Sequence, residues 1–183
     1  MKKLVALSVL SLISLPALAS DLNTVLGVEA GHKHTQLSAE ILPSENGFFY
    51  NSAWTKNFRD GVNVASAGVG YQHSVGLVDG YVGIKAAYIA PKKGDNGFAA
   101  PFGGGVRIHM TNDIYAYGEG YVATRGMNNA VQKYVEVDSG VAYTPKENVV
   151  LNVGYRYMGV DGKSETPNHA LIDGAYVGAG YKF

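Results

Sequence analysis

The sequence predicts an all-β protein, an up-and-down antiparallel transmembrane β-barrel of about ten strands. Three observations lead to this prediction. Apolar residues recur at every second position, which is the period of a strand and not of a helix. The chain contains 24 Gly and 13 Tyr, a composition that favours turns and sheet. Its last stretch, residues 172–183, alternates an apolar face with a face of glycines and polar residues and ends on Phe183.

The first 19 residues have the layout of a secretory signal peptide. Residues 2 and 3 are lysines, an apolar run follows at 4–15, and residues 17–19 read Ala-Leu-Ala, a small-x-small cleavage site. A retained membrane anchor is disfavoured because the apolar run is too short to span a bilayer comfortably. We therefore expect an exported mature chain, residues 20–183, that forms one domain.

Composition narrows the classes of partner and of membrane crossing. The 15 basic and 15 acidic residues give a formal net charge of zero, and no basic stripe is present, so nucleic acid is not an expected partner. The absence of cysteine excludes disulfides. No stretch after residue 19 holds 18 consecutive apolar residues, so the mature chain could cross a bilayer only as a closed barrel.

Turn residues divide the mature chain into ten alternating segments. We expect strands at residues 24–31, 35–42, 48–55, 63–73, 78–90, 98–109, 114–124, 131–144, 149–159 and 172–183. The apolar residues that share a face in the first five segments are Leu26, Val28 and Ala30; Leu37, Ala39 and Ile41; Tyr50 and Trp54; Ala65, Ala67, Val69 and Tyr71; and Val78, Val82, Ile84, Ala86 and Tyr88.

The later segments repeat the pattern, with one variation. Residues 114–124 place tyrosines and Glu119 on one face and small residues on the other. In the remaining segments the apolar faces are Ala100, Phe102, Val106 and Ile108; Val135, Val137, Val141 and Tyr143; Val149, Leu151, Val153, Tyr155 and Tyr157; and Ala175, Val177, Ala179, Tyr181 and Phe183.

The expected connections alternate in length. Those at 43–47, 74–76, 111–113 and 145–148 are mostly tight, whereas those at 56–61, 91–97, 125–130 and 160–171 are longer. Short turns on one rim and longer loops on the other are typical of outer-membrane barrels. The connection at 32–34 should be a long one and is short, so a barrel of eight strands remains an alternative if the first pair is irregular.

Charges within the strands lie opposite the apolar face, with Lys133 as the exception. An outward charge at the middle of a bilayer costs about 2–4 kcal/mol, so the apolar face should point to lipid and the charged face to a plugged or narrow lumen. A soluble barrel would reverse the two faces and alternate equally well. The expected lumen charge network is Lys85, Arg107, Glu119, Glu136, Asp138 and Arg156.

Aromatic residues near the predicted strand ends are expected to lie at the two membrane interfaces, where amphipathic rings are enriched. These are Trp54, Tyr71, Tyr88, Tyr143, Tyr157, Tyr181 and Phe183.

Several motifs carry a family resemblance. Residues 96–106 read NGFAAPFGGGV, residues 154–157 read GYRY, residues 118–119 read GE with Tyr121 following, and residues 173–178 read DGAYVG before the final Phe183. With these motifs the mature chain resembles, almost end to end, the YfaZ family of small Gram-negative outer-membrane proteins. The resemblance implies a β-barrel in the outer membrane and no particular activity. The chain departs from the family in its middle loops, and Pro101 lies within the motif strand, where we expect a bulge.

Two side-chain groupings could carry chemistry. His32 and His34 stand two apart and could face one metal ion, but no third ligand is evident and an exposed polar corner is the preferred interpretation. His109 with Glu119 or Asp138 could form an acid–base pair beside Ser139 or Ser66. Nothing in the sequence fixes those residues in contact. We therefore expect no catalytic residue, no metal, no cofactor and no enzyme activity.

The preferred hypothesis is an integral outer-membrane barrel with a structural or interaction role. The alternatives are a narrow porin-like channel for small solutes and a soluble periplasmic carrier barrel. Expected partners are outer-membrane lipid and lipopolysaccharide, whose phosphates Lys92 and Lys93 could contact, and the barrel-assembly machinery, which would engage the C-terminal strand.

Overall fold

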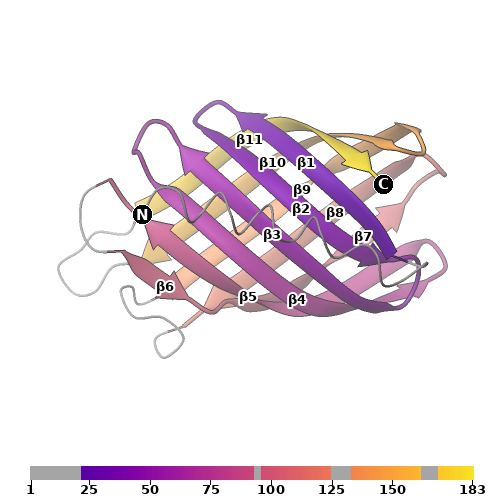
Figure 1. Ribbon diagram of the computed structural model, residues 1–183, viewed down its shortest axis with the longest axis horizontal. Helices are drawn as coiled ribbons and strands as arrows, with labels where there is room; N and C mark the ends of the chain where they lie inside the picture. Colours follow the sequence, from indigo (N-terminus) through magenta and orange to yellow (C-terminus); the bar gives the residue numbers. More distant parts are fainter. Residues whose placement is uncertain (1–21, 93–95, 125–132, 162–168) are drawn as a thin grey trace.

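The computed structural model describes residues 22–92, 96–124, 133–161 and 169–183 (Figure 1). The expected signal peptide and the loop lysine Lys93 lie outside the described residues. All regular structure in the described part is β-strand, and no helix there is long and apolar enough to cross a membrane. The strands are β1 (Leu22–Gly31), β2 (His34–Pro43), β3 (Gly47–Asn57), β4 (Asn63–Val75), β5 (Val78–Ala90), β6 (Gly97–Ala99), β7 (Phe102–His109), β8 (Ile114–Ala123), β9 (Lys133–Lys146), β10 (Val149–Asp161) and β11 (His169–Lys182).

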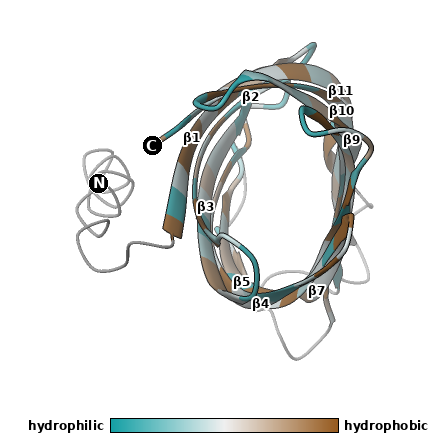
Figure 2. Ribbon diagram, turned by 90° about the vertical axis from the view of Figure 1, so that its right-hand side faces the viewer, coloured by the Kyte–Doolittle hydropathy of each residue, from teal (hydrophilic) through white to brown (hydrophobic). Residues whose placement is uncertain are grey.

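The strands form one closed antiparallel ring (Figure 2). Consecutive strands pair with one another, and β1 pairs with β11, where Leu26 lies opposite Tyr181. Both β6 and β7 pair with β5, so they are two parts of one strand. The result is a ten-stranded barrel, which confirms the predicted fold and excludes the eight-stranded alternative.

The bulge expected at Pro101 is wrong. Ala99 lies opposite Ala87 and Phe102 opposite Ile84, so three steps on one strand match three on the other and no extra residue is inserted. Pro101 only removes one N–H from the ladder, and its carbonyl accepts a hydrogen bond of 2.8 Å from the backbone N–H of Lys85.

Register shifts occur instead in β10. One lies between Met158 and Gly159 against β11, and the other lies between Val149 and Leu151 against β9.

The two rims of the barrel differ in the length of their connections. One rim carries the connections 44–46, 76–77, 110–113 and 147–148, together with Leu22 and Phe183. The other carries 32–33, 58–62, 91–96, 124–132 and 162–168. We call them the short-turn rim, at the right of Figure 1, and the long-loop rim, at its left. In outer-membrane barrels the short turns face the periplasm and the long loops face outward.

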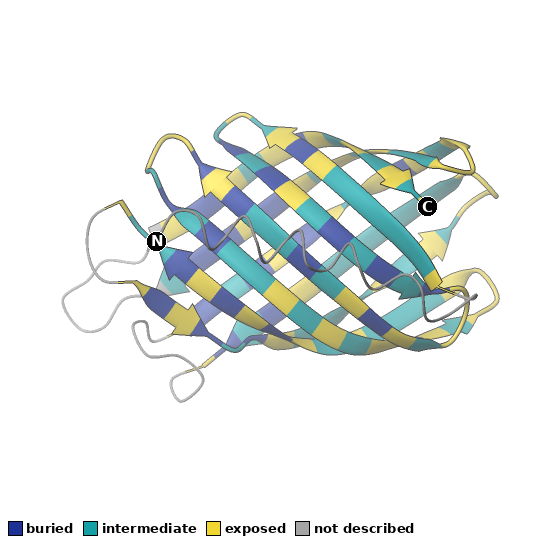
Figure 3. Ribbon diagram, in the orientation of Figure 1, coloured by how far each residue is buried: buried dark blue, intermediate teal, exposed yellow. Residues whose placement is uncertain are grey.

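Most of the large apolar residues of the strands face outward, and most of the charged ones face inward. Val153, Val177 and Phe102 are 56%, 62% and 50% exposed on the outer wall, and Figure 3 shows exposed and buried positions alternating along the strands. Arg107 and Arg156 line the interior. This is the orientation that the segregation of charge predicts, and it is the reverse of a soluble carrier barrel.

Candidate functional site: the lumen

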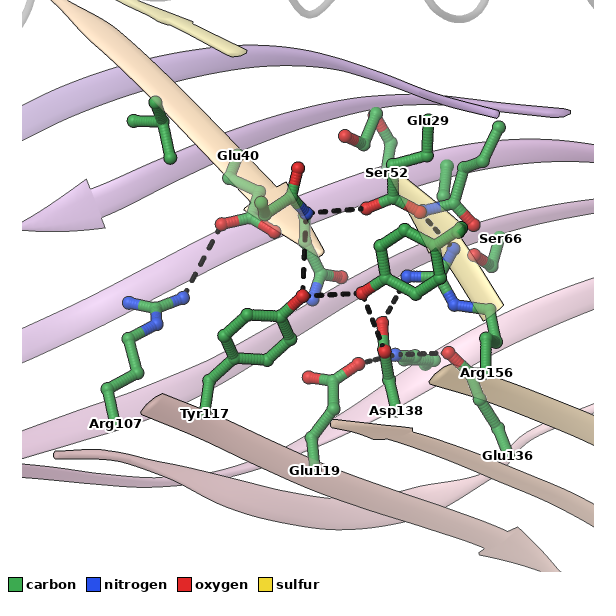
Figure 4. Close-up of a pocket in the computed structure, with 18 of the residues that line it drawn as sticks. Glu29, Glu40, Ser52, Ser66, Arg107, Tyr117, Glu119, Glu136, Asp138 and Arg156 are labelled. Atoms are coloured by element: carbon green, nitrogen blue, oxygen red, sulfur yellow. Dashed lines mark hydrogen bonds and ion pairs between the residues drawn. The ribbon is translucent and has the colours of Figure 1, made fainter. Parts of the chain in front are cut away.

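The interior of the barrel holds a cavity of about 130 Å³ (Figure 4). Its charged lining comes from seven strands, β1, β2, β5, β7, β8, β9 and β10. The ionisable groups of opposite sign in this lining are Lys85, Arg107 and Arg156 against Glu29, Glu40, Glu119, Glu136 and Asp138.

Arg156 of β10 joins two carboxylates. It lies directly opposite Asp138 of β9 in the ladder, and its Nη2 donates to the Asp138 carboxylate. Its Nη1 donates to Glu29 Oε2 of β1 at 2.6 Å. Arg156 is only 5% exposed, so this guanidinium depends on its two carboxylates for compensation.

Lys85 of β5 forms the second centre. Its Nζ lies 3.0 Å from Glu136 Oε1 and 3.3 Å from Glu119 Oε1, on β9 and β8. The same Nζ lies 3.8 Å from the centroid of the Tyr121 ring, within the range of a cation–π contact. Glu119 lies directly opposite Asp138 in the ladder, so Lys85 and Arg156 also relieve a like-charge cross-strand pair.

A third pair spans the lumen closer to the short-turn rim. Arg107 Nη2 of β7 lies 3.5 Å from Glu40 Oε2 of β2, and these strands are separated by β3, β4 and β5 around the ring. Near the same rim, His109 Nε2 lies 2.8 Å from Asp79 Oδ2. The ion pairs therefore tie distant parts of the wall together.

Aromatic rings inside the barrel lie against glycines that are their direct cross-strand partners. The pairs are Phe49 with Gly70, Tyr81 with Gly105, Tyr117 with Gly140, and Tyr176 with Gly154. A Cβ on Gly154 would lie 2.6 Å from the Tyr176 hydroxyl oxygen, and one on Gly140 would lie 2.5 Å from that of Tyr117. The glycines thus leave room for the four rings, and the three tyrosines among them bring hydroxyls to the charged centre.

Those hydroxyls extend the ion pairs into a network. The Tyr176 hydroxyl donates to Asp138 Oδ1 at 2.8 Å and lies 2.6 Å from the Tyr117 hydroxyl. The Tyr81 hydroxyl donates to Glu119 Oε2 at 2.8 Å, and the Tyr134 hydroxyl donates to Glu136 Oε2 at 3.0 Å. Such bonds satisfy carboxylate oxygens that the cations leave free.

Replacing Gly154 with alanine is expected to lower the free energy of unfolding by about 1–3 kcal/mol, because the new methyl group overlaps both the Tyr176 ring and the Ser139 carbonyl oxygen. Denaturant unfolding of the detergent-folded protein measures the change. Gly118→Ala is the matched control, since a Cβ there meets nothing within 4 Å and the change should stay within about 0.5 kcal/mol. Equal losses in the two variants would show that the Gly154–Tyr176 fit is unimportant.

Toward the long-loop rim part of the interior is apolar, beside the buried polar side chains of His34, Thr55 and Asn57. The buried residues that form this apolar tier come from β4, β5, β6, β8, β9, β10 and β11 and from the loop before β4: Val62, Val64, Ala87, Ile89, Ala99, Ala123, Tyr134, Met158, Leu171 and Ile172. Asn57 of β3 links to this tier, because its Nδ2 donates a hydrogen bond of 2.6 Å to the carbonyl oxygen of Leu171 in β11. The alternation of apolar and charged residues predicts a polar interior throughout, and the apolar tier corrects that prediction.

The structure places all six residues of the expected charge network on the lining of one cavity. Lys85 contacts Glu119 and Glu136, and Arg156 contacts Asp138, whereas Arg107 pairs outside the six, with Glu40. Glu29 and Glu40 are the carboxylic residues of the lining that the expected network omits. Both residues lie opposite the apolar face of their strands, and this pattern could have assigned them to the lumen network.

The aromatic residues expected at the membrane interfaces divide between the two ends of the wall. Trp54, Tyr88 and Tyr157 lie in the halves of their strands that lead to the long-loop rim. Toward the short-turn rim lie Tyr71, Tyr143, Tyr181 and Phe183, all of them exposed.

The groupings considered for catalysis and metal binding are not assembled. His109 pairs with Asp79 and not with Glu119 or Asp138, and Ser139 is exposed on the outer wall while Ser66 lines the cavity. Among the described contacts, neither serine has a histidine as a hydrogen-bond partner.

The two histidines of the first turn lie in different surroundings. His34 is 1% exposed and meets Tyr176 edge to face, whereas His32 is exposed, so they do not share the exposed corner that the sequence suggested. In the described ranges no three His, Cys, Asp or Glu side chains are arranged to hold a metal.

A closed antiparallel barrel with an apolar outer wall and ionised residues inside defines a class, the outer-membrane β-barrel proteins. The family described as "YfaZ precursor" matches residues 1–183, and the chain belongs to this family. It is similar to "Outer membrane protein YfaZ" of Escherichia coli (strain K12), with 33% identity over 155 residues that cover 85% of this chain and 86% of that protein. The protein is therefore an outer-membrane β-barrel protein.

Solved structures with a similar arrangement have low sequence identity. One is described as "De novo design of transmembrane beta-barrels", with a TM-score of 0.41, 14% identity and coverage of 89% of this chain and 95% of that chain. Another is "Outer-membrane expressed OmpT of Vibrio cholerae", with a TM-score of 0.43, 13% identity and coverage of 82% and 56%.

Proposed function

We propose that the protein is a closed outer-membrane barrel that acts through its wall and rims, as a structural or interaction protein, and does not conduct solutes. The observation that carries the proposal is the pairing of charges across the lumen. Arg107 reaches from β7 to Glu40 on β2, and Lys85 reaches from β5 to β8 and β9. Charges fixed to one another in this way occupy the path that a solute would take.

The apolar tier gives the proposal a second support. Within it Tyr134 has no exposed surface, and Met158 and Ile172 are 2% and 3% exposed. An apolar constriction excludes hydrated ions because they would lose their water without gaining a polar partner. The ionised centre and the apolar tier close different levels of the same lumen.

No catalytic role is assigned to the lumen groups under this proposal. Each of Lys85, Arg156 and Glu119 is engaged by neighbouring side chains. The ionised residues then serve as cross-links between strands.

Planar-bilayer recording tests the closed lumen. The wild-type protein is expected to insert without stepwise conductance. A variant with Tyr134→Ala, Met158→Ala, Arg107→Ser and Glu40→Ser should produce discrete steps, because it removes part of the apolar tier and the cross-lumen pair together. Heat-modifiable migration on a gel confirms that each protein is folded before recording.

The porin-like channel is the competing function, favoured by the polar lining of the cavity. Steps of equal size from the wild type and the opened variant would establish it and overturn the proposal. A variant carrying Val82→Ala and Ile84→Ala on the outer wall is the control, since these side chains are exposed and should leave the recording silent.

A further inference from the structure

Four basic side chains gather at one part of the long-loop rim. They come from the β1–β2 turn, the end of β3, the β3–β4 loop and the loop after β5, and they are Lys33, Lys56, Arg59 and Lys92. Lys56, Arg59 and Lys92 are exposed, and Lys33 is half-buried. We call these four residues the basic rim cluster.

Backbone contacts hold the cluster together. The Phe58 N–H donates to the Lys33 carbonyl oxygen at 2.9 Å, which joins the β1–β2 turn to the β3–β4 loop. The Lys56 Nζ lies 5.8 Å from the centroid of the Phe58 ring, and that ring is 59% exposed. The cluster thus combines cations with an exposed aromatic side chain.

The β3–β4 loop has a defined shape. Asn57 Oδ1 accepts hydrogen bonds from the N–H groups of Arg59 and Asp60 at 2.8 and 3.1 Å. Gly61 has a φ of 68°, in the left-handed region that favours glycine, and a Cβ there would lie 2.9 Å from Lys92 Cδ. The absence of that Cβ lets Lys92 lie against the loop that carries Arg59.

The charges of the cluster are not neutralised by the described chain. None of the four cations forms an ion pair with a carboxylate in residues 22–92, 96–124, 133–160 and 170–183. The neighbouring acid, Asp60, receives a hydrogen bond of 3.2 Å from Asn57 Nδ2. The described residues therefore leave the positive charge of the cluster unpaired.

The position of the basic rim cluster along the barrel axis indicates the kind of partner. Lys56 is two residues beyond Trp54 along β3, toward the long-loop rim, and Trp54 is among the aromatic residues expected at the membrane interface. Cations just beyond an aromatic belt lie at the level of lipid headgroups. Phe58 lies beside them as an apolar anchor.

We propose that the basic rim cluster binds the phosphate groups of a glycolipid of the outer leaflet, with Lys56 and Arg59 as the principal contacts. Arginine forms paired hydrogen bonds to phosphate, and lysine adds a point charge. This inference does not depend on whether the lumen conducts, so the recording described above and the experiment below can fail independently.

Binding of bisphosphorylated lipid A to the folded mature protein in detergent tests the proposal. Trp54, the single tryptophan of the sequence, reports binding through its fluorescence. The double variant Lys56→Gln/Arg59→Gln is expected to bind roughly 30-fold more weakly, because each basic residue near an anionic lipid surface contributes roughly fivefold. Lipid A without its phosphates should bind the wild type with a similar loss.

The control removes the same charge at the other rim. Lys146→Gln/Lys182→Gln should leave the dissociation constant within about twofold, since these residues lie at the short-turn ends of β9 and β11. An equal loss in both double variants would overturn the assignment to the cluster, and equal binding of dephosphorylated lipid A would overturn the role of phosphate. Displacement of the lipid by an equimolar amount of inorganic phosphate would show an anion site and not a lipid site.

Discussion

Replacing Arg156 with methionine is expected to destabilise the folded barrel by about 3–5 kcal/mol. The substitution keeps an unbranched side chain but leaves the carboxylates of Glu29 and Asp138 without their shared cation in a nearly dry interior. Breaking a buried ion pair by removing one partner carries a cost of this size. Guanidinium unfolding of the detergent-folded protein, followed by Trp54 fluorescence, measures the loss.

A charge-neutral variant separates electrostatics from packing. Adding Glu29→Gln and Asp138→Asn to Arg156→Met should recover most of the lost stability, because the whole ion triad is then removed instead of one member. Lys146→Met, at an exposed position near the short-turn rim, should change stability by no more than about 0.5 kcal/mol. If the triple variant is no more stable than Arg156→Met, the charge network is not what holds these strands.

Val177→Arg is expected to destabilise the protein in lipid vesicles by about 2–4 kcal/mol. Val177 is 62% exposed on the outer wall near the middle of β11, opposite Val153 and Ala30 in the ladder. An arginine at this place must reach out of the hydrocarbon or carry its charge within it. Reversible folding in vesicles of defined lipid gives the free-energy change.

Val75→Arg is the matched control for this prediction. Val75 is 66% exposed at the end of β4 beside a short turn, so its arginine should reach the interface at a cost of about 0–1 kcal/mol. In a barrel surrounded by water both substitutions would be nearly neutral. Equal small effects of the two variants in vesicles would therefore contradict the orientation of the wall.

The strands could be predicted closely because their signals are local. The ten expected segments match the observed barrel, with β6 and β7 together filling the segment 98–109. Period-two alternation and turn residues depend only on neighbours in the chain. The short connection between β1 and β2 made the count ambiguous, since turn length alone does not show whether two strands pair.

The candidate site was predictable as a set of residues but not as a set of contacts. Alternation assigned Lys85 and Arg156 to the lumen side, yet Lys85 meets a carboxylate 51 residues away and Arg156 one 127 residues away. Which groups meet depends on the stagger between successive strands, and this accumulates around the ring.

The apolar tier is a second feature that the sequence pattern could not predict. Met158 and Ile172 lie in segments of alternating apolar and polar residues. Alternation alone predicts that the inward face of such a strand is polar along its whole length. The register shift at Met158 and Gly159 also changes the pairing at Leu171, which is buried in the tier. Local patterning carries no information on how side chains stack at one end of a closed lumen.

The sequence by itself determined the strand segments and the apolar and charged sides of each strand, because these follow from neighbouring residues. Only the tertiary structure decided that the apolar sides face outward, that Arg156 meets Glu29, that Arg107 crosses to Glu40 and that apolar side chains gather inside toward the long-loop rim. Those contacts exist only after the last strand has paired with the first, when side chains from distant parts of the chain are brought face to face across the lumen.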